Sequence, residues 1–161
     1  MLYKTLIRPY RQGDGKALEP FLSRAKFLYG DKDFPLGEHH ALYFLFVDDA
    51  SIGGLIEAEV SFYVHLDGVL PCFKLTKLAF DPEFNDDEFV LSLLSFLCLE
   101  GKKMGIAALF LDGAEIAFEK ELGFTLAAPN GIYLSQNPEA HIPSLRYKLL
   151  GEEPLPPGFL S

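Results

Sequence analysis

The strict alternation of side chains from Ile56 to Leu66 constrains the fold more than any other feature of this sequence. Apolar residues stand at every second position: Ile56, Ala58, Val60, Phe62, Val64 and Leu66. The positions between them are Glu57, Glu59, Ser61, Tyr63 and His65. Successive side chains of a β-strand point to opposite faces, so the pattern predicts a long strand with one core face and one polar face.

Two interpretations of the polar face stay open. It is either the solvated face of an antiparallel sheet, or the lining of a cleft in which Glu57 or Glu59 acts as general base towards an amine. Alternation alone accounts for the first interpretation. The second needs a base that works near neutral pH.

Further strands and helices are predicted along the chain. Beyond a first strand near the N-terminus, strands are expected at 42–47, 52–66, 72–80, 106–111, 123–127 and 145–150, the first two of these as a hairpin. Helices are expected at 14–25, 87–103 and 114–121, and the stretch 30–40 is expected to be a loop. Because proline fits best in a first turn, Pro20 favours a start nearer Lys16 or Ala17 for the first helix. This order of elements predicts an α/β (α+β) domain over residues 1–150, followed by a Pro-rich tail over 151–161.

Composition excludes several classes of protein. The net charge of −9 argues against binding to nucleic acid, which depends on Lys and Arg. No apolar stretch reaches the roughly 20 residues that a membrane-spanning helix needs. Cys72 and Cys98 form no C-x-x-C pair and His39–His40 lacks spaced partners, so neither a disulfide nor a metal site is expected. The N-terminus lacks the pattern of a signal peptide, which predicts a cytoplasmic protein.

Three segments resemble the GNAT superfamily of acyl-CoA-dependent N-acetyltransferases. Ile52-Gly53-Gly54 is similar to the start of that family's third strand, and Leu78 to Phe84 (LAFDPEF) is similar to the end of its fourth. Phe118 to Phe124 (FEKELGF) is similar to its F-Y-x-K-L-G-F motif. The resemblance implies a mixed, mostly antiparallel sheet with helices on both faces. It also implies a splay between the fourth and fifth strands, here 72–80 and 106–111.

The resemblance also implies acetyl-CoA as cofactor. In the family, pantetheine pairs with the exposed backbone of the fourth strand, which assigns Leu78 and Phe80 to cofactor binding. The pyrophosphate lies on a glycine-containing loop at the start of the next helix, which corresponds here to Asn85–Val90 and assigns Asn85, Glu88, Phe89 and Val90. Both glycine positions of that loop are occupied, by Glu88 and Val90. The acidic run Asp86–Glu88 is expected to cap the helix rather than to bind a cation, and so to take the place of the phosphates.

A second departure lies in the F-Y-x-K-L-G-F segment, where Glu119 replaces the tyrosine that protonates the leaving thiolate in the family. Two functions follow from these comparisons of motifs. One is acyl transfer from acyl-CoA to an amine, with CoA binding weakened or lost and with Glu57, Glu59 and Glu119 as candidate catalytic residues. The alternative is an inactive binding or scaffolding protein with the same fold. The extended tail favours a homodimer.

Overall fold

The computed structural model of the chain describes residues 4–30, 40–48, 51–65, 68–84, 86–111, 119–126 and 146–151. The chain divides into two compact units, Met1–Ala58 with Thr76–Leu97, and Glu59–Leu75 with Cys98–Ser161. The tail from residue 152, on which the homodimer prediction depends, lies outside the described residues, as does Asn85. The domain boundary at residue 150 therefore stays a prediction.

The strands form a sheet in the order β1-β3-β4-β5-β6-β8-β7, and β2 pairs with β5 beside this path. The strands are β1 Thr5–Pro9, β2 Lys26–Tyr29, β3 His40–Val47, β4 Ser51–His65, β5 Gly68–Phe80, β6 Ala108–Leu111, β7 Thr125–Leu126 and β8 Arg146–Leu149. The helices are α1 Gly15–Arg24 and α2 Asp87–Lys103, with the short 3₁₀ helix η1 at Pro82–Phe84. The pairs β1/β3, β2/β5, β6/β8 and β7/β8 are antiparallel, and β5/β6 is parallel. The prediction of a mixed, largely antiparallel sheet is confirmed.

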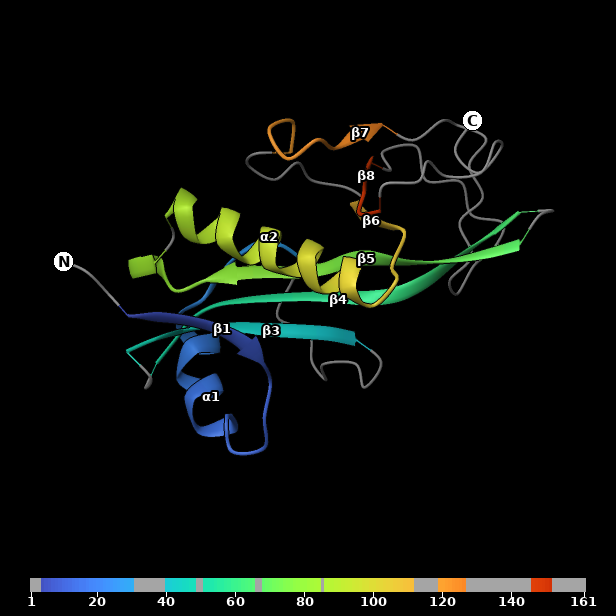
Figure 1. Cartoon of the computed structure of the whole chain (residues 1–161). Coiled ribbons are helices and arrows are strands. Elements are labelled where there is room, and N and C mark those ends of the chain that lie inside the picture. Colours follow the sequence, from blue (N-terminus) through green and yellow to red (C-terminus); the bar gives the residue numbers. More distant parts are fainter. Residues whose placement is uncertain are drawn as a thin grey trace. The chain divides into compact units, whose positions relative to one another are not determined.

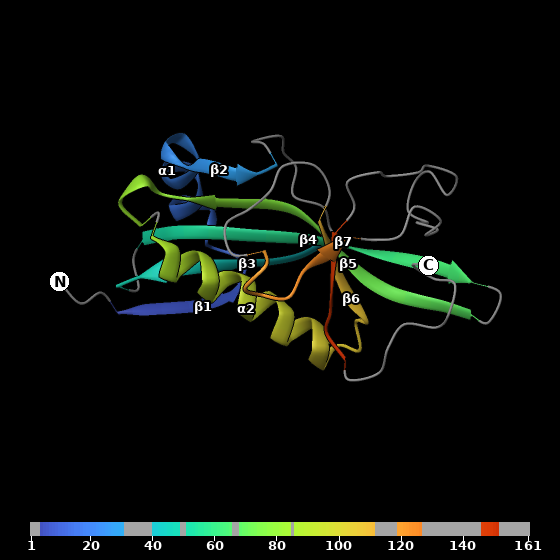
Figure 2. The same cartoon turned by 90° about the horizontal axis from the view of Figure 1, so that it is seen from above.

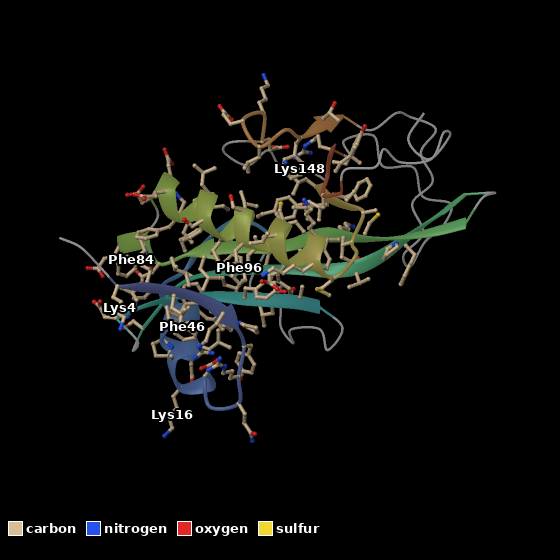
Figure 3. The ribbon with its side chains drawn as sticks, in the orientation of Figure 1. Lys4, Lys16, Phe46, Phe84, Phe96 and Lys148 are labelled. Carbon is tan, nitrogen blue, oxygen red and sulfur yellow. The ribbon has the colours of Figure 1, made fainter. Side chains whose placement is uncertain are left out.

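In the first unit, α1 and α2 cover opposite faces of β3 (Figure 1). Phe44 and Phe46 belong to one buried cluster with Phe21 of α1. The neighbouring Tyr43 instead contacts Phe96 of α2, with ring centroids 5.1 Å apart. Figure 3 shows Phe46 on the α1 side of the sheet and Phe96 on α2. Because adjacent residues of a strand point to opposite faces, the apolar run of β3 is buried on both sides and the expected helices on both faces are confirmed.

Helix α1 begins at Gly15, so Pro20 lies in its interior and the expected start at Lys16 or Ala17 is wrong. Asp14 precedes the helix but its side chain does not cap it. Its carboxylate instead accepts hydrogen bonds from the Arg8 guanidinium (2.8 and 2.9 Å) and from the Arg11 N–H (2.7 Å). The hydrogen bond from Arg8 holds the pKa of Asp14 below its ordinary value. Asp14 therefore ties the start of α1 to β1.

The second unit contains the parallel contact of β5 with β6, at Phe73↔Leu109 and Lys74↔Phe110. Strand β8 pairs antiparallel with the other edge of β6 over Ala108↔Leu149 to Leu111↔Arg146. Residues 112–118, which would complete the expected helix at 114–121, lie outside the described part. The segment ends in a turn closed by Phe124 N–H to Glu119 O (2.9 Å) and Gly123 N–H to Lys120 O (3.1 Å), with Gly123 at φ +89°. This is the αL glycine termination typical of a helix C-terminus.

Candidate functional site

The final residues of β5, Leu78–Phe80, carry the backbone that the resemblance assigns to pantetheine. We call this backbone the β5 terminal edge. Both Leu78 and Phe80 have fully buried side chains, so only main-chain groups are available for pairing. In the structure this edge is paired by β2, at Lys26↔Phe80, Phe27↔Ala79 and Tyr29↔Leu78 (Figure 2). The sequence prediction had no strand between α1 and the loop at 30–40, so β2 is a correction to it.

The residue after β2 is held unusually close to β5. Gly30 has φ +75°, and a Cβ built on it would overlap the carbonyl oxygen of Thr76 and lie 3.3 Å from the Cα of Lys77. A side chain at this position is therefore excluded both by conformation and by space. Because residue 30 is glycine, the main chain directly after β2 can lie in contact with the backbone of β5.

An ion pair joins the chain before β2 to the end of β5. Arg24, the last residue of α1, donates from Nε (3.0 Å) and approaches with its terminal nitrogen (2.8 Å) the same carboxylate oxygen of Asp81. Asp81 is buried, and its other oxygen accepts the N–H of Glu83 at 3.1 Å. The ladder of β2 is thus flanked by an ion pair at its start and a close glycine contact at its end.

The start of α2 is capped by the chain itself. Asp86 Oδ1 accepts the N–H of Glu88 at 3.0 Å, and the Asp86 carbonyl accepts the N–H groups of Phe89 (3.0 Å) and Val90 (3.1 Å). The expectation of capping by the acidic run is confirmed for Asp86. Asp87 and Glu88 are exposed in the first turn, whereas Val90 is buried. Phe89 packs on Phe84, with 6.1 Å between the ring centroids, and Figure 3 labels Phe84 beside this end of α2. Three N–H groups at the helix start therefore already have acceptors.

Replacing Asp86 with alanine should destabilise the protein by about 1 kcal/mol, because the N–H of Glu88 loses its acceptor. Urea unfolding measures this change from the shift in midpoint at constant slope. The matched control is Asp87→Ala, which removes the same charge one residue later, keeps the hydrogen bond from the Glu88 N–H to Asp86, and should cost only a few tenths of a kcal/mol. Equal losses for the two variants would show that charge rather than capping stabilises this helix start.

The first candidate base, Glu57, is fully buried in β4, so the interpretation of this face as solvated is wrong at that position. Its Oε1 accepts a hydrogen bond from Thr76 Oγ1 at 2.7 Å, and the same hydroxyl lies 3.0 Å from the Glu57 carbonyl oxygen. Glu59 is half-buried and belongs to the second unit. Phe62, expected on the core face, is 48% exposed. The alternation therefore predicted the strand and the burial of Ile56 and Ala58 correctly, but it was wrong for Glu57 and Phe62.

The third candidate, Glu119, pairs with Arg146 of β8. Arg146 Nε donates to Oε1 at 2.7 Å and its NH2 group donates to Oε2 at 3.2 Å, and both side chains are nearly buried. Lys148 on the same strand donates to the carbonyl of Leu122 at 2.6 Å. A carboxylate that accepts two guanidinium hydrogen bonds is engaged as an acceptor, which describes a structural contact. Whether Glu119 also takes part in catalysis stays a prediction.

Other chemistry in the described residues is limited. Cys72 and Cys98 are free, and burial raises their pKa to about 12 and about 11. Across the described segments no group of three or more His, Cys, Asp or Glu side chains is placed to hold a metal ion. Nor does any helix in those segments combine the length and apolarity needed to cross a bilayer.

Neither a protein-family model nor a curated protein sequence matches this chain. Solved structures do match it. The GNAT family N-acetyltransferase YhbS from Escherichia coli, solved with CoA, has a TM-score of 0.68 at 16% identity over 94% of this chain and 84% of its own. The ribosomal-protein-S18-alanine N-acetyltransferase of E. coli has 0.61 at 21% identity (94% and 97%). A Staphylococcus aureus acetyltransferase of the GNAT family has 0.62 at 14% identity (92% and 100%). This chain has the fold of the GNAT N-acetyltransferases.

Proposed function

We propose that this protein is a GNAT-fold binding or scaffolding protein whose own chain closes the acyl-CoA site that the family resemblance implies. The observation that carries the proposal is the pairing of β2 with the β5 terminal edge. Pantetheine would bind there by forming main-chain hydrogen bonds, as an added strand does. A backbone edge that is already paired offers no such hydrogen bonds.

The start of α2 supports the same proposal. A pyrophosphate at a helix N-terminus is bound by free N–H groups and by the helix dipole. Here Asp86 accepts the N–H of Glu88, and the carboxylates of Asp86, Asp87 and Glu88 place negative charge at this end. These side chains are exposed, so at about 4 Å each pair of like charges is worth roughly 1 kcal/mol of repulsion in water, and salt weakens it further. Binding of the pantetheine arm would therefore be opposed by β2, and binding of the pyrophosphate by the carboxylates at the start of α2.

The alternative function is acyl transfer from acyl-CoA to an amine, and one observation favours it. Glu57 is a buried carboxylate oriented by the Thr76 hydroxyl, and a fixed carboxylate can accept a proton from an ammonium group. The CoA complex of YhbS is in line with CoA use in proteins of this fold. For both functions a cytoplasmic location stays a prediction.

Acetyl-CoA at millimolar concentration should leave the melting temperature of this protein unchanged. A ligand at 100 times its dissociation constant adds about 2.7 kcal/mol, which is a shift of roughly 5–10 °C for a chain of this size. Differential scanning fluorimetry with E. coli YhbS as positive control makes the comparison. A shift of several degrees, or release of CoA thiol in the presence of an amine, would establish the alternative instead.

A further inference from the structure

Strand β2 is weakly attached compared with its neighbours in the first unit. Lys26 is exposed and Phe27, Leu28 and Tyr29 are half-buried, whereas residues 43–47 of β3 are all buried. Its ladder with β5 has three residue pairs, and its register shifts between Phe27 and Tyr29. Short, partly exposed and irregular ladders belong to the part of a structure that opens at low free energy.

The elements on either side of β2 are also suited to release. The preceding helix α1 carries Pro20 in its interior, where proline lacks the N–H for the helical hydrogen bond and weakens the helix. The ion pair between Arg24 and Asp81 has its arginine 59% exposed, so water and salt weaken it. Gly30, at φ +75°, is outside the extended conformation of a strand, so the ladder of β2 ends at Tyr29 and stays short.

We propose that β2 is a removable strap that regulates access to the β5 terminal edge. With the strap paired, the edge is closed; with the strap released, the backbone of Leu78–Phe80 admits an extended chain with amide groups, of which the pantetheine arm of acyl-CoA is one. The inference rests on the proposed function, because it explains how a closed site of this kind can be opened. Main-chain pairing tolerates a change of partner, since the hydrogen bonds of the edge do not depend on side chains.

A disulfide can hold the strap in place. Phe27 and Ala79 are partners in the antiparallel ladder, and such partners lie about 4.5–5.5 Å apart at Cα, within the range of a disulfide. The double variant Phe27→Cys/Ala79→Cys forms this bond when oxidised glutathione removes two electrons and two protons, and a phosphine reductant reverses it. Cys72 and Cys98 compete little, because their raised pKa values, about 12 and about 11, keep them protonated at neutral pH. The single variant Phe27→Cys is the matched control for the loss of the aromatic ring.

Amide hydrogen exchange tests the release without any ligand. The reduced double variant lacks the Phe27 side chain, which packs against the buried cluster around Phe44 and Phe46. Its strap should therefore open more often than that of the oxidised variant, in which the disulfide holds it. We expect exchange at Leu78–Phe80 at least about tenfold faster in the reduced than in the oxidised protein, while β3 exchanges equally in both. Equal rates at Leu78–Phe80 would show that β2 leaves only on global unfolding, and the strap would be refuted.

Calorimetry with acetyl-CoA tests what the strap regulates. The reduced double variant and Phe27→Cys should bind acetyl-CoA weakly, because the carboxylates at the start of α2 still repel its phosphates, and the oxidised double variant should show no binding. Suppose that amide exchange at Leu78–Phe80 is faster in the reduced double variant but that this variant does not bind acetyl-CoA. This result would refute the strap as a regulator of acetyl-CoA binding and would leave the proposed function intact. Binding of acetyl-CoA by the unmodified protein and equally by the oxidised variant would refute the proposed function itself, because the cofactor would not need the β5 terminal edge.

Discussion

Replacing Glu119 with alanine should destabilise the protein by about 3 kcal/mol, a loss of roughly 6–12 °C in melting temperature. The physical reason is the Arg146 guanidinium, whose side chain is only 12% exposed and which would remain in place without its bidentate partner. Removing one member of a nearly buried ion pair costs more than the pair contributes, since Arg146 loses two carboxylate hydrogen bonds while its charge is still largely removed from water. Urea unfolding provides the measurement.

The Arg146→Ala variant and the double variant complete a mutant cycle. Because the double variant removes both charges, its loss should be smaller than the sum of the single losses by at least about 1 kcal/mol. Glu119→Gln controls for volume, as it keeps the shape and loses the charge. A change of less than about 0.5 kcal/mol for Glu119→Ala would show that the ion pair contributes nothing. In that case a catalytic role would become the better reason for the carboxylate at this position.

Elements whose hydrophobic pattern matches one period over many residues could be predicted from the sequence. The helix at 87–103 has its apolar residues at helical spacing, acidic residues before it and Gly105 at φ +81° after it, and α2 occupies those residues. The strand expected at 52–66 alternates from Ile56 onward, and β4 spans Ser51–His65. In these segments local preference and tertiary packing favour the same structure, which makes the prediction reliable.

Strand β2 could not be predicted because nothing in its own residues requires it. Lys26–Tyr29 follows a helix directly and is too short to show a period of two. Its conformation comes from pairing with a strand about fifty residues later, and a contact of that separation has no local signal. The closed state of the candidate site depends on this contact, so the sequence predicted the acidic cap at Asp86 but not the closure of the β5 terminal edge.

The burial of Glu57 could likewise not be predicted from the alternation of apolar and polar residues. Alternation separates two faces of a strand, but it does not say which face is covered by another element. A carboxylate is buried only where a donor is available, and here the donor is the Thr76 hydroxyl on β5. Thr76 stands inside an expected strand with no feature that marks it as the partner of Glu57. The hydrogen bond between Thr76 and Glu57 could therefore be found only once the register of β4 against β5 was known.

Replacing Gly30 with alanine should release β2 and destabilise the protein by about 2–4 kcal/mol. An alanine at φ +75° costs roughly 1–2 kcal/mol, and its Cβ would overlap the Thr76 carbonyl oxygen, which belongs to the sheet backbone and cannot move freely. The control is Gly105→Ala, at the similar φ of +81° but with nothing within 4 Å of the new Cβ, so it should show only the conformational cost. Urea unfolding compares the two free energies, and amide exchange at Leu78–Phe80 should become faster only in Gly30→Ala. Equal destabilisation by both substitutions, with unchanged exchange at Leu78–Phe80, would show that the close approach of Gly30 does not hold β2 against β5.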